Sequence, residues 1–205
     1  MRTIIHFFIR LFFAVFASAV TLLISMILSD GPSFMPYLLA FAAGIVTYYG
    51  VKLFMYIRFL RRNGLTRREY KIVERNLDEA KNKIYRLQKT FMKIQNLPHA
   101  KQNFETMRVI HKIYHTTKKE PRRFFLVEDF YYSHLDSLVE LAEKYTFLAS
   151  QPAKSLELKR SLAETRETMN DVVKMIEKDL HHMIEGDIDS LLFEMDVAKK
   201  RIDRS

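Results

Sequence analysis

The chain has 205 residues, a net charge of +9, five glycines, five prolines and no cysteine. The absence of cysteine excludes disulfides, thiolate nucleophiles and cysteine-based zinc sites. So few glycines and prolines argue against a sheet protein with many tight turns and favour long helices. Residues 1–57 are apolar and aromatic, whereas residues 58–205 are polar, charged and rich in Glu, Lys, Leu and Arg.

The positive charge is concentrated near the start of the chain. Residues 1–70 hold eight Lys or Arg and two acidic residues, a net charge of +6, and the other 135 residues carry +3. A nucleic-acid-binding protein would instead spread positive charge over a folded face. We therefore expect no nucleic-acid partner.

Two apolar segments predict membrane-spanning helices. Residues 11–28 and 34–51 are each runs of 18 residues without a charge. A spanning helix needs about 20 such residues, and both runs can be extended at their ends. We expect spans at about residues 8–28 and 34–54, within a transmembrane hairpin over 1–57, which makes the lipid bilayer the first predicted partner.

The distribution of basic residues predicts the orientation of this hairpin. Ser, Asp, Gly, Pro and Ser at positions 29–33 form a compact turn sequence without Lys or Arg. The positive-inside rule then places both termini in the cytoplasm, at the plasma membrane. Five arginines behind the second span can lie against anionic head groups, or can act only as a topology signal. They are Arg58, Arg61, Arg62, Arg67 and Arg68.

A secretory signal peptide is the alternative for the first apolar run. Ala17, Ser18 and Ala19 resemble a cleavage site, but apolar sequence continues for nine residues beyond them. A second apolar run then follows at once. We therefore expect the first segment to be retained as a span.

The polar region begins with a strong helix signal. Thr66 and Glu69 fit a capping box, with Thr66 as the N-cap. Apolar residues then recur at alternating spacings of 4 and 3, the pattern of a heptad seam. The seam consists of Val73, Leu77, Ala80, Ile84, Leu87, Phe91 and Ile94. Pro98 is expected to end this helix.

Further amphipathic helices are predicted along the remaining chain. One covers about residues 100–114, and the others begin at Pro121, at about 155 and at about 188. A polar break at 116–120 and a second break at Gly186 and Asp187 separate them. The expected core positions of the 100–114 helix are Phe104, Met107, Ile110, Ile113 and Tyr114.

Long amphipathic helices with short connections indicate an antiparallel helical bundle or coiled-coil domain over residues 58–205. No stretch shows the alternation of a strand, so the predicted fold class is all-α. The apolar seams could also bind another helical protein or a second copy in a homo-oligomer. Packing within the chain is the favoured interpretation.

A basic stretch before an aromatic one is the candidate phosphate-binding site. Its cations are Lys118, Lys119, Arg122 and Arg123. They surround a predicted helix start, where free amides and the helix dipole attract anions. His134 and Asp136 follow as candidate catalytic groups for a phosphate monoester. Pairing of the arginines with glutamates of the bundle is the favoured alternative.

Two histidine patterns were considered as metal sites. His111 and His115 lie one helical turn apart, but Lys112 stands where a zincin would have glutamate. His181 and His182 lie among acidic residues, without the second matching motif of a di-metal site. We predict no metal site, and the sequence names no cofactor. It also lacks a Walker A loop and a Gly-x-Ser-x-Gly elbow.

Several segments carry a family resemblance. They are Gly64-Leu65-Thr66-Arg67-Arg68-Glu69-Tyr70, Lys119-Glu120-Pro121-Arg122-Arg123-Phe124, Tyr132-Ser133-His134-Leu135-Asp136-Ser137 and the 187–199 tail. With the two-span start, they resemble the bacterial XpaC family over the whole chain. The resemblance implies a link to hydrolysis of bromo-chloroindolyl phosphate and a helical partner similar to toxic-anion (tellurite) resistance proteins. It transfers no catalytic residue.

Two functions remain in competition. The favoured one is a membrane-tethered scaffold or adaptor that gathers the toxic-anion-resistance-like partner at the inner leaflet. The other is a phosphohydrolase in which Lys119, Arg122 and Arg123 clamp the phosphate and His134 or a metal-bound water supplies acid–base chemistry. A pore is disfavoured, because the spans contain no intramembrane acid or base.

Overall fold

The computed structural model describes residues 2–28, 34–93, 100–152 and 155–202. Every regular element in these ranges is helical, which confirms the all-α prediction. The chain divides into two compact units, Met1–Thr66 and Arg67–Ser205. The turn predicted at 29–33, and the predicted roles of Ile94 and Pro98, lie outside the described residues.

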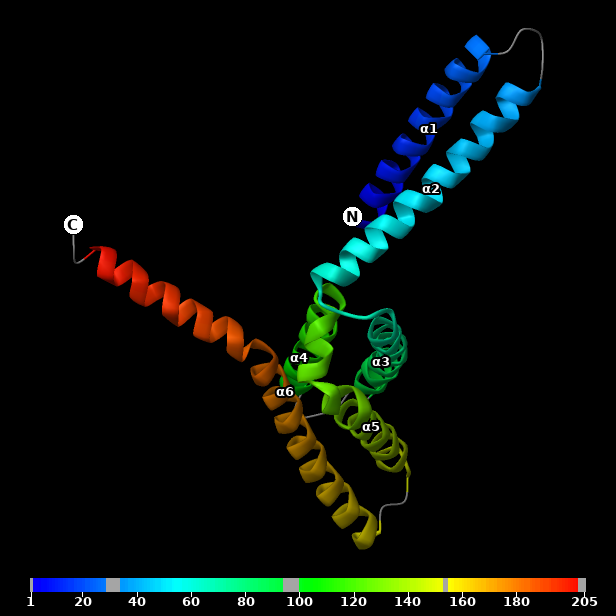
Figure 1. Ribbon diagram of the computed structural model, residues 1–205. Helices are drawn as coiled ribbons and strands as arrows, with labels where there is room; N and C mark the ends of the chain where they lie inside the picture. Colours follow the sequence, from blue (N-terminus) through cyan, green and yellow to red (C-terminus); the bar gives the residue numbers. More distant parts are fainter. Residues whose placement is uncertain (1, 29–33, 94–99, 153–154, 203–205) are drawn as a thin grey trace. The chain divides into compact units, whose positions relative to one another are not determined.

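The first unit is a hairpin of two helices, α1 (Arg2–Leu28) and α2 (Met35–Arg62), which pack against each other (Figure 1). Small residues form their contact. Ala14 and Ala40 are buried, and a Cβ added at Gly44 would overlap Ser18 Oγ. The Ser18 hydroxyl donates to Ala14 O at 2.9 Å, which satisfies it within its own helix. The absence of a side chain at Gly44 therefore permits the close approach of α1 and α2.

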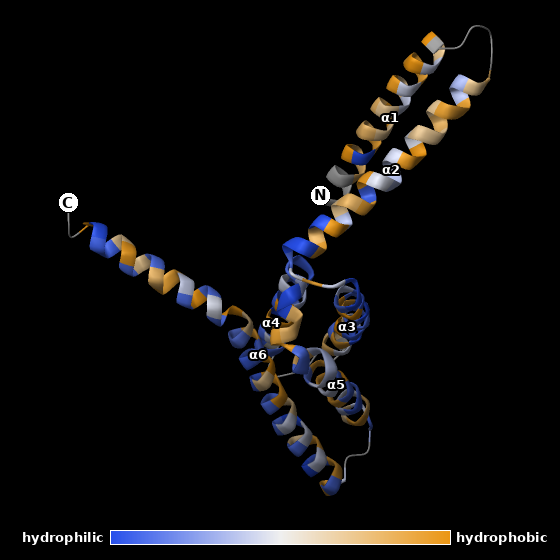
Figure 2. Cartoon of the chain, in the orientation of Figure 1, coloured by the Kyte–Doolittle hydropathy of each residue, from blue (hydrophilic) through white to orange (hydrophobic). Residues whose placement is uncertain are grey.

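The outer surface of this hairpin is apolar, as the orange residues of α1 and α2 show (Figure 2). The span Phe7–Ile27 has a mean hydropathy of 2.3 and Met35–Arg62 one of 1.6, and 0% and 6% of these windows are buried. Both helices are long and apolar enough to cross a membrane. The second helix continues to Arg62, beyond the apolar run that predicted it.

The end of α2 is fixed by a glycine in the left-handed region. Gly64 has φ 61°, which a residue with a side chain adopts only at a cost. The N–H of Gly64 donates to Arg61 O and that of Leu65 donates to Leu60 O, both at 3.1 Å. These two bonds are the Schellman pattern of a helix C-terminus. The next helix begins directly after Thr66, where the sequence predicted an N-cap.

In its described residues, the second unit contains four α-helices and two irregular helices. In chain order they are α3 (Arg67–Lys93), α4 (Ala100–Lys119), the 3-10 helix η1 (Pro121–Leu126), the π-helix η2 (Phe130–His134), α5 (Leu135–Ala149) and α6 (Leu156–Ile202). Helix α3 contacts α4 and α5, and α6 contacts the same two. The four α-helices therefore form a bundle around one core.

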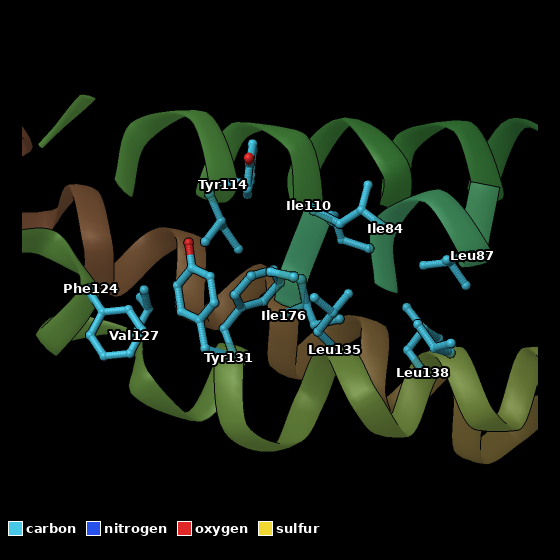
Figure 3. Packing of buried hydrophobic residues seen from close by; sticks show 14 of the residues in the cluster. Ile84, Leu87, Ile110, Tyr114, Phe124, Val127, Tyr131, Leu135, Leu138 and Ile176 are labelled. Atoms are coloured by element: carbon cyan, nitrogen blue, oxygen red, sulfur yellow. The ribbon is translucent and has the colours of Figure 1, made fainter. Parts of the chain in front are cut away.

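The predicted seam of α3 faces this core. Val73, Ala80, Ile84 and Leu87 are buried, and Leu77 and Phe91 pack against the cluster. Side chains of the other helices complete it, as Figure 3 shows for Ile110 of α4, Leu135 and Leu138 of α5, and Ile176 of α6. The heptad periodicity thus identified the buried face correctly.

Two predictions for α4 were wrong. The break predicted at 116–120 is reduced to Glu120, since α4 continues to Lys119 and η1 begins at Pro121. Thr117 is fully buried there, so the sequence read as a polar loop is a helical turn with one face on the core. Phe104, an expected core residue, is 67% exposed, whereas Thr106 is buried and donates to Gln102 O at 2.9 Å.

The break predicted at Gly186 and Asp187 is also absent, since α6 runs through both residues. A glycine within a helix costs only about 1 kcal/mol relative to alanine. Arg123 offsets this cost because it donates to Met183 O, at 2.9 Å, and to Asp187, and so holds the helix on both sides of the glycine.

Candidate functional site

The most irregular part of the bundle is residues 120–134, here called the corner segment, which joins α4 to α5. The sequence predicted a regular helix from Pro121, but a 3-10 helix and then a π-helix occur. The change of helical period lets Phe124, Val127, Phe130 and Tyr131 all reach the core. Single π-helical turns occur frequently at functional sites, so the corner segment is the candidate site.

Arg123 is the most highly connected cation of this segment. Its Nε donates to Glu120 Oε2 at 2.6 Å, and Nη1 and Nη2 donate to the two oxygens of Asp187 at 2.7 and 2.8 Å. The bond to Asp187 is the largest cause that raises the pKa of Arg123, and the same bond lowers the pKa of Asp187. A phosphate bound by this guanidinium would have to displace two carboxylates.

The other three predicted phosphate-binding residues point to separate environments. Lys118 Nζ lies over the Tyr114 ring, 5.9 Å from its centroid. Lys119 Nζ is 3.9 Å from Glu120 Oε1. Arg122 is exposed and has no ion-pair partner among the residues that the structure describes. Of these three cations, only Lys119 contacts Glu120, the carboxylate that Arg123 also binds.

The two candidate catalytic groups have different partners. His134 Nδ1 lies 2.7 Å from Asp179 Oδ2 of α6, and the two side chains are 21% and 13% exposed. Asp136 instead pairs with Lys83 of α3 at 3.0 Å. The Asp179 carboxylate can orient the imidazole, so that its Nε2 could exchange a proton with a ligand. Sequence reasoning missed the pairing of His134 with Asp179, because 45 residues separate them and only the folded bundle brings them together.

Helix α6 holds the corner segment through further polar contacts. His182 Nδ1 lies 2.9 Å from Leu126 O. On the opposite side, Asn76 Nδ2 of α3 donates to the hydroxyl of Tyr132 at 3.4 Å. His182 and Asp187, which belong to the cluster weighed as a metal site, therefore make separate structural contacts. In the described ranges, no group of three or more His, Asp or Glu is placed to hold a metal ion.

The corner segment also exposes apolar side chains. Phe125 is 40% exposed, Leu126 46% and Tyr132 55%. The rings of Phe125 and Tyr132 both contact the buried Phe124 ring edge to face, with centroids 5.4 and 5.9 Å apart. We call the three exposed residues the corner patch, because exposed apolar side chains that gather on a surface mark interaction sites.

The arginines predicted to lie at a membrane surface are all exposed. Arg58, Arg61 and Arg62 occupy the last turns of α2 at spacings of three and four residues, which place them on one helix face. Arg67 and Arg68 begin α3, in the second compact unit. Each group presents positive charge to its surroundings without an ion-pair partner among the residues described.

These features define an all-α protein that joins a hairpin of membrane-span character to a helical bundle. A family model described as "5-bromo-4-chloroindolyl phosphate hydrolysis protein" matches residues 8–198, and the chain belongs to this family. Protein XpaC of Bacillus subtilis (strain 168) is 48% identical over 141 residues, which are 69% of each chain. No solved structure matches the chain. The resemblance to the XpaC family is thereby confirmed, with the Bacillus protein as a relative.

Proposed function

We propose that the chain is a membrane-anchored helical scaffold that supports hydrolysis of bromo-chloroindolyl phosphate indirectly. In this proposal the hairpin crosses the plasma membrane twice, with both termini in the cytoplasm. The apolar outer surface of α1 and α2 supports the anchor. The lack of Lys and Arg at 29–33 and the arginines behind α2 support the orientation.

The observation that carries the scaffold proposal is that three polar side chains in or next to the corner segment are engaged in ion pairs. Arg123, His134 and Asp136 each pair with a carboxylate or a lysine from another helix or a neighbouring turn. These pairs connect α3, α6 and the segment itself, which stabilises a fixed surface. An enzyme would instead direct such groups toward a shared substrate position.

The partner in this proposal is a helical protein similar to the toxic-anion resistance proteins. The corner patch supports a docking role, because Phe125, Leu126 and Tyr132 are exposed and the rings of Phe125 and Tyr132 both contact the buried Phe124 ring. Arg122, exposed beside them, can pair with an acidic residue of the partner.

The first test is an assay of the full-length, detergent-purified protein on 5-bromo-4-chloroindolyl phosphate, with and without divalent metal. We expect no turnover above buffer, while cells that lack the protein lose hydrolysis. Turnover by the purified protein at enzymatic rates would refute the scaffold proposal.

A second test addresses the corner patch. Tyr132→Ser should lower hydrolysis by intact cells and recovery of the toxic-anion-resistance-like protein with the chain, without lowering the amount of the chain. Phe147→Ser is the matched control, because Phe147 is 67% exposed on α5 and outside the patch. Equal effects of the two substitutions would remove the patch from the proposal.

The second candidate function is direct hydrolysis of phosphate monoesters. The family description and the contact between His134 and Asp179 favour it. Lys118, Lys119, Arg122 and Arg123 would then bind the phosphate, and His134 would transfer the proton. His134→Gln and Arg122→Ala should abolish turnover by folded, purified protein. If both variants keep the full rate of an active wild type, this assignment fails.

A further inference from the structure

Helix α6 carries two apolar seams in succession. The first faces the bundle, with Ile176 0% and Met183 1% exposed and the other members packed against the core. It consists of Met169, Val172, Val173, Ile176, Leu180, Met183 and Ile184. The register of Ile176, Leu180 and Met183 continues with Asp187, Ser190 and Glu194, which are polar. The first seam therefore ends where α6 leaves the core.

The second seam follows Ile184 by four residues and lies one residue out of the register of Ile176, Leu180 and Met183. Its members recur at spacings of 3, 4, 3 and 4 and are Ile188, Leu191, Met195, Ala198 and Ile202. In an α-helix, an offset of one residue turns a face by about 100°, so the second seam is turned away from the side on which Ile176 and Met183 are buried. We call the second set the tail seam.

The tail seam is uncovered. Ile188 is 38% exposed, Leu191 57%, Met195 45% and Ile202 74%. Figure 1 shows the red end of α6 projecting away from α3, α4 and α5, and Figure 2 shows apolar residues along it. A continuous apolar stripe with heptad spacing is the surface that a second helix covers in a coiled coil.

We propose that the tail seam pairs with the tail seam of a second copy of this chain, in a parallel two-stranded coiled coil. Ile188, Met195 and Ile202 occupy the a positions of the heptad, and Leu191 and Ala198 occupy the d positions. This arrangement goes beyond the proposed function, since neither a scaffold nor an enzyme requires it.

The charged residues beside the tail seam favour a second copy of this chain as the partner and a parallel orientation of the two helices. Glu194 is at a g position and Lys199 at the following e position, which face each other between parallel strands. Within one chain, residues five apart do not face each other, and neither has an ion-pair partner among the described residues. An antiparallel pair centred on this seam would instead place Glu194 against Glu194 of the partner copy.

The charges of this segment also disfavour an anionic bilayer as the surface that covers the tail seam. Residues 187–202 contain four acidic and three basic residues. Asp187 and Glu194 occupy two of the three g positions beside the apolar stripe, where a membrane-surface helix would carry Lys or Arg. A protein helix with the complementary pattern fits better, and the tail seam itself has that pattern.

The length of the seam sets the strength of the pairing. Fifteen residues of helix extend about 22 Å, or two heptads, which is marginal for isolated helices. Confinement of both copies to one membrane would raise their effective concentration. This estimate of strength, and the use of isolated membranes in the test below, rest on the proposed anchor.

The absence of cysteine allows a direct test with single-cysteine variants of the full-length chain. We would oxidise isolated membranes mildly and measure the disulfide-linked dimer on a non-reducing gel. Met195→Cys and Ala198→Cys should both form the dimer, because parallel pairing brings like a and like d positions together. Ser190→Cys, on the continuation of the first seam, is the control and should remain monomeric.

The outcomes separate the arrangements. Crosslinking of Met195→Cys without Ala198→Cys would overturn the parallel register. Absence of crosslinking in both would overturn pairing with a second copy. Equal crosslinking of Ser190→Cys would show that the crosslinks arise from random collision, and would overturn the pairing as well. None of these outcomes depends on phosphate hydrolysis, so they leave the proposed function untouched.

A charge exchange tests the proposed ionic pair. In the Ala198→Cys background, Glu194→Lys and Lys199→Glu should each lower dimer yield, by about fivefold, because like charges then oppose each other. The double variant should restore the yield. Failure of the double variant to restore it would refute the pairing of Glu194 with Lys199.

Discussion

The two compact units bury opposite kinds of side chain. In Met1–Thr66, Phe8 is 62% and Phe12 67% exposed, whereas the alanines Ala14 and Ala40 are buried. In Arg67–Ser205, aromatic side chains such as Phe130 are fully buried.

This difference follows from the surroundings that each unit suits. In water, burial of apolar surface stabilises a fold by about 25 cal/mol per Å², so the largest side chains move inside. In lipid, that gain disappears, and helices associate where small residues let their backbones approach. The residues that hold a helix pair together therefore depend on the solvent as well as on the sequence.

The largest expected effect comes from the core of the bundle. Phe130→Ala should lower the free energy of unfolding by about 3–5 kcal/mol, because it leaves a cavity among fully buried side chains. Phe12→Ala, on the outer surface of the hairpin, should change it by less than about 0.5 kcal/mol. Urea unfolding of the detergent-solubilised chain, followed by circular dichroism, measures both. Similar losses for the two variants would contradict the comparison.

A substitution at the small-residue contact tests the hairpin. Gly44→Leu should force α1 and α2 apart at Ser18 and cost about 1–3 kcal/mol. Gly50→Leu is the matched control, because a Cβ at Gly50 meets nothing within 4 Å. The readout is the temperature at which half of the detergent-solubilised chain aggregates. No difference between the two leucine variants would show that close packing at Gly44 is unimportant.

Arg123→Ala should have an intermediate effect. The side chain is 20% exposed, and it connects Glu120, Asp187 and Met183 O across the corner segment. Because Asp187 is exposed, solvent screens part of the interaction, and we expect a loss of about 1–2 kcal/mol. Arg122→Ala, which removes an exposed charge with no described partner, should stay within about 0.5 kcal/mol. The urea unfolding midpoints of the two variants, compared with that of the wild type, test this difference; equal midpoints would contradict it.

The smallest expected effect is a pH dependence from α4. Burial, and then the neighbouring His115, lower the pKa of His111 below its usual value of 6.5. The unfolded chain therefore binds this proton more tightly than the folded one, and stability falls as the pH decreases below about 6.5. His111→Gln should reduce that loss between pH 7.5 and pH 5.5. An unchanged pH profile of the urea midpoint in this variant would exclude His111 as a cause.

More of the fold than of the candidate site could be predicted from the sequence. Heptad spacing identified the buried face of α3, because periodicity along one helix is a local property. The corner segment could not be predicted in the same way. Its 3-10 and π-helical turns result from the need to bury Phe124 and Phe130 together, which depends on the helices packed around them.

The candidate site shows the same limit. The cations around Pro121 read as one cluster in the sequence, but Lys118 lies over Tyr114 while Arg123 is held by Asp187. Tyr114 lies one turn before Lys118 on α4, whereas Asp187 lies on α6, whose distance in space from Arg123 the sequence does not give. The contact of His134 with Asp179 was missed for this reason.

By itself, the sequence determined the all-α class, the two apolar helices and the family, because hydropathy, helical periodicity and family segments are properties of the chain read in order. The tertiary structure decided which charges meet, how α4 and α6 continue through predicted breaks, and which apolar seams are covered. Ile176 and Leu191 belong to equally apolar seams of one helix, yet the first is buried and the second is 57% exposed. The reason is that periodicity specifies a face of a helix, whereas only packing specifies what covers it.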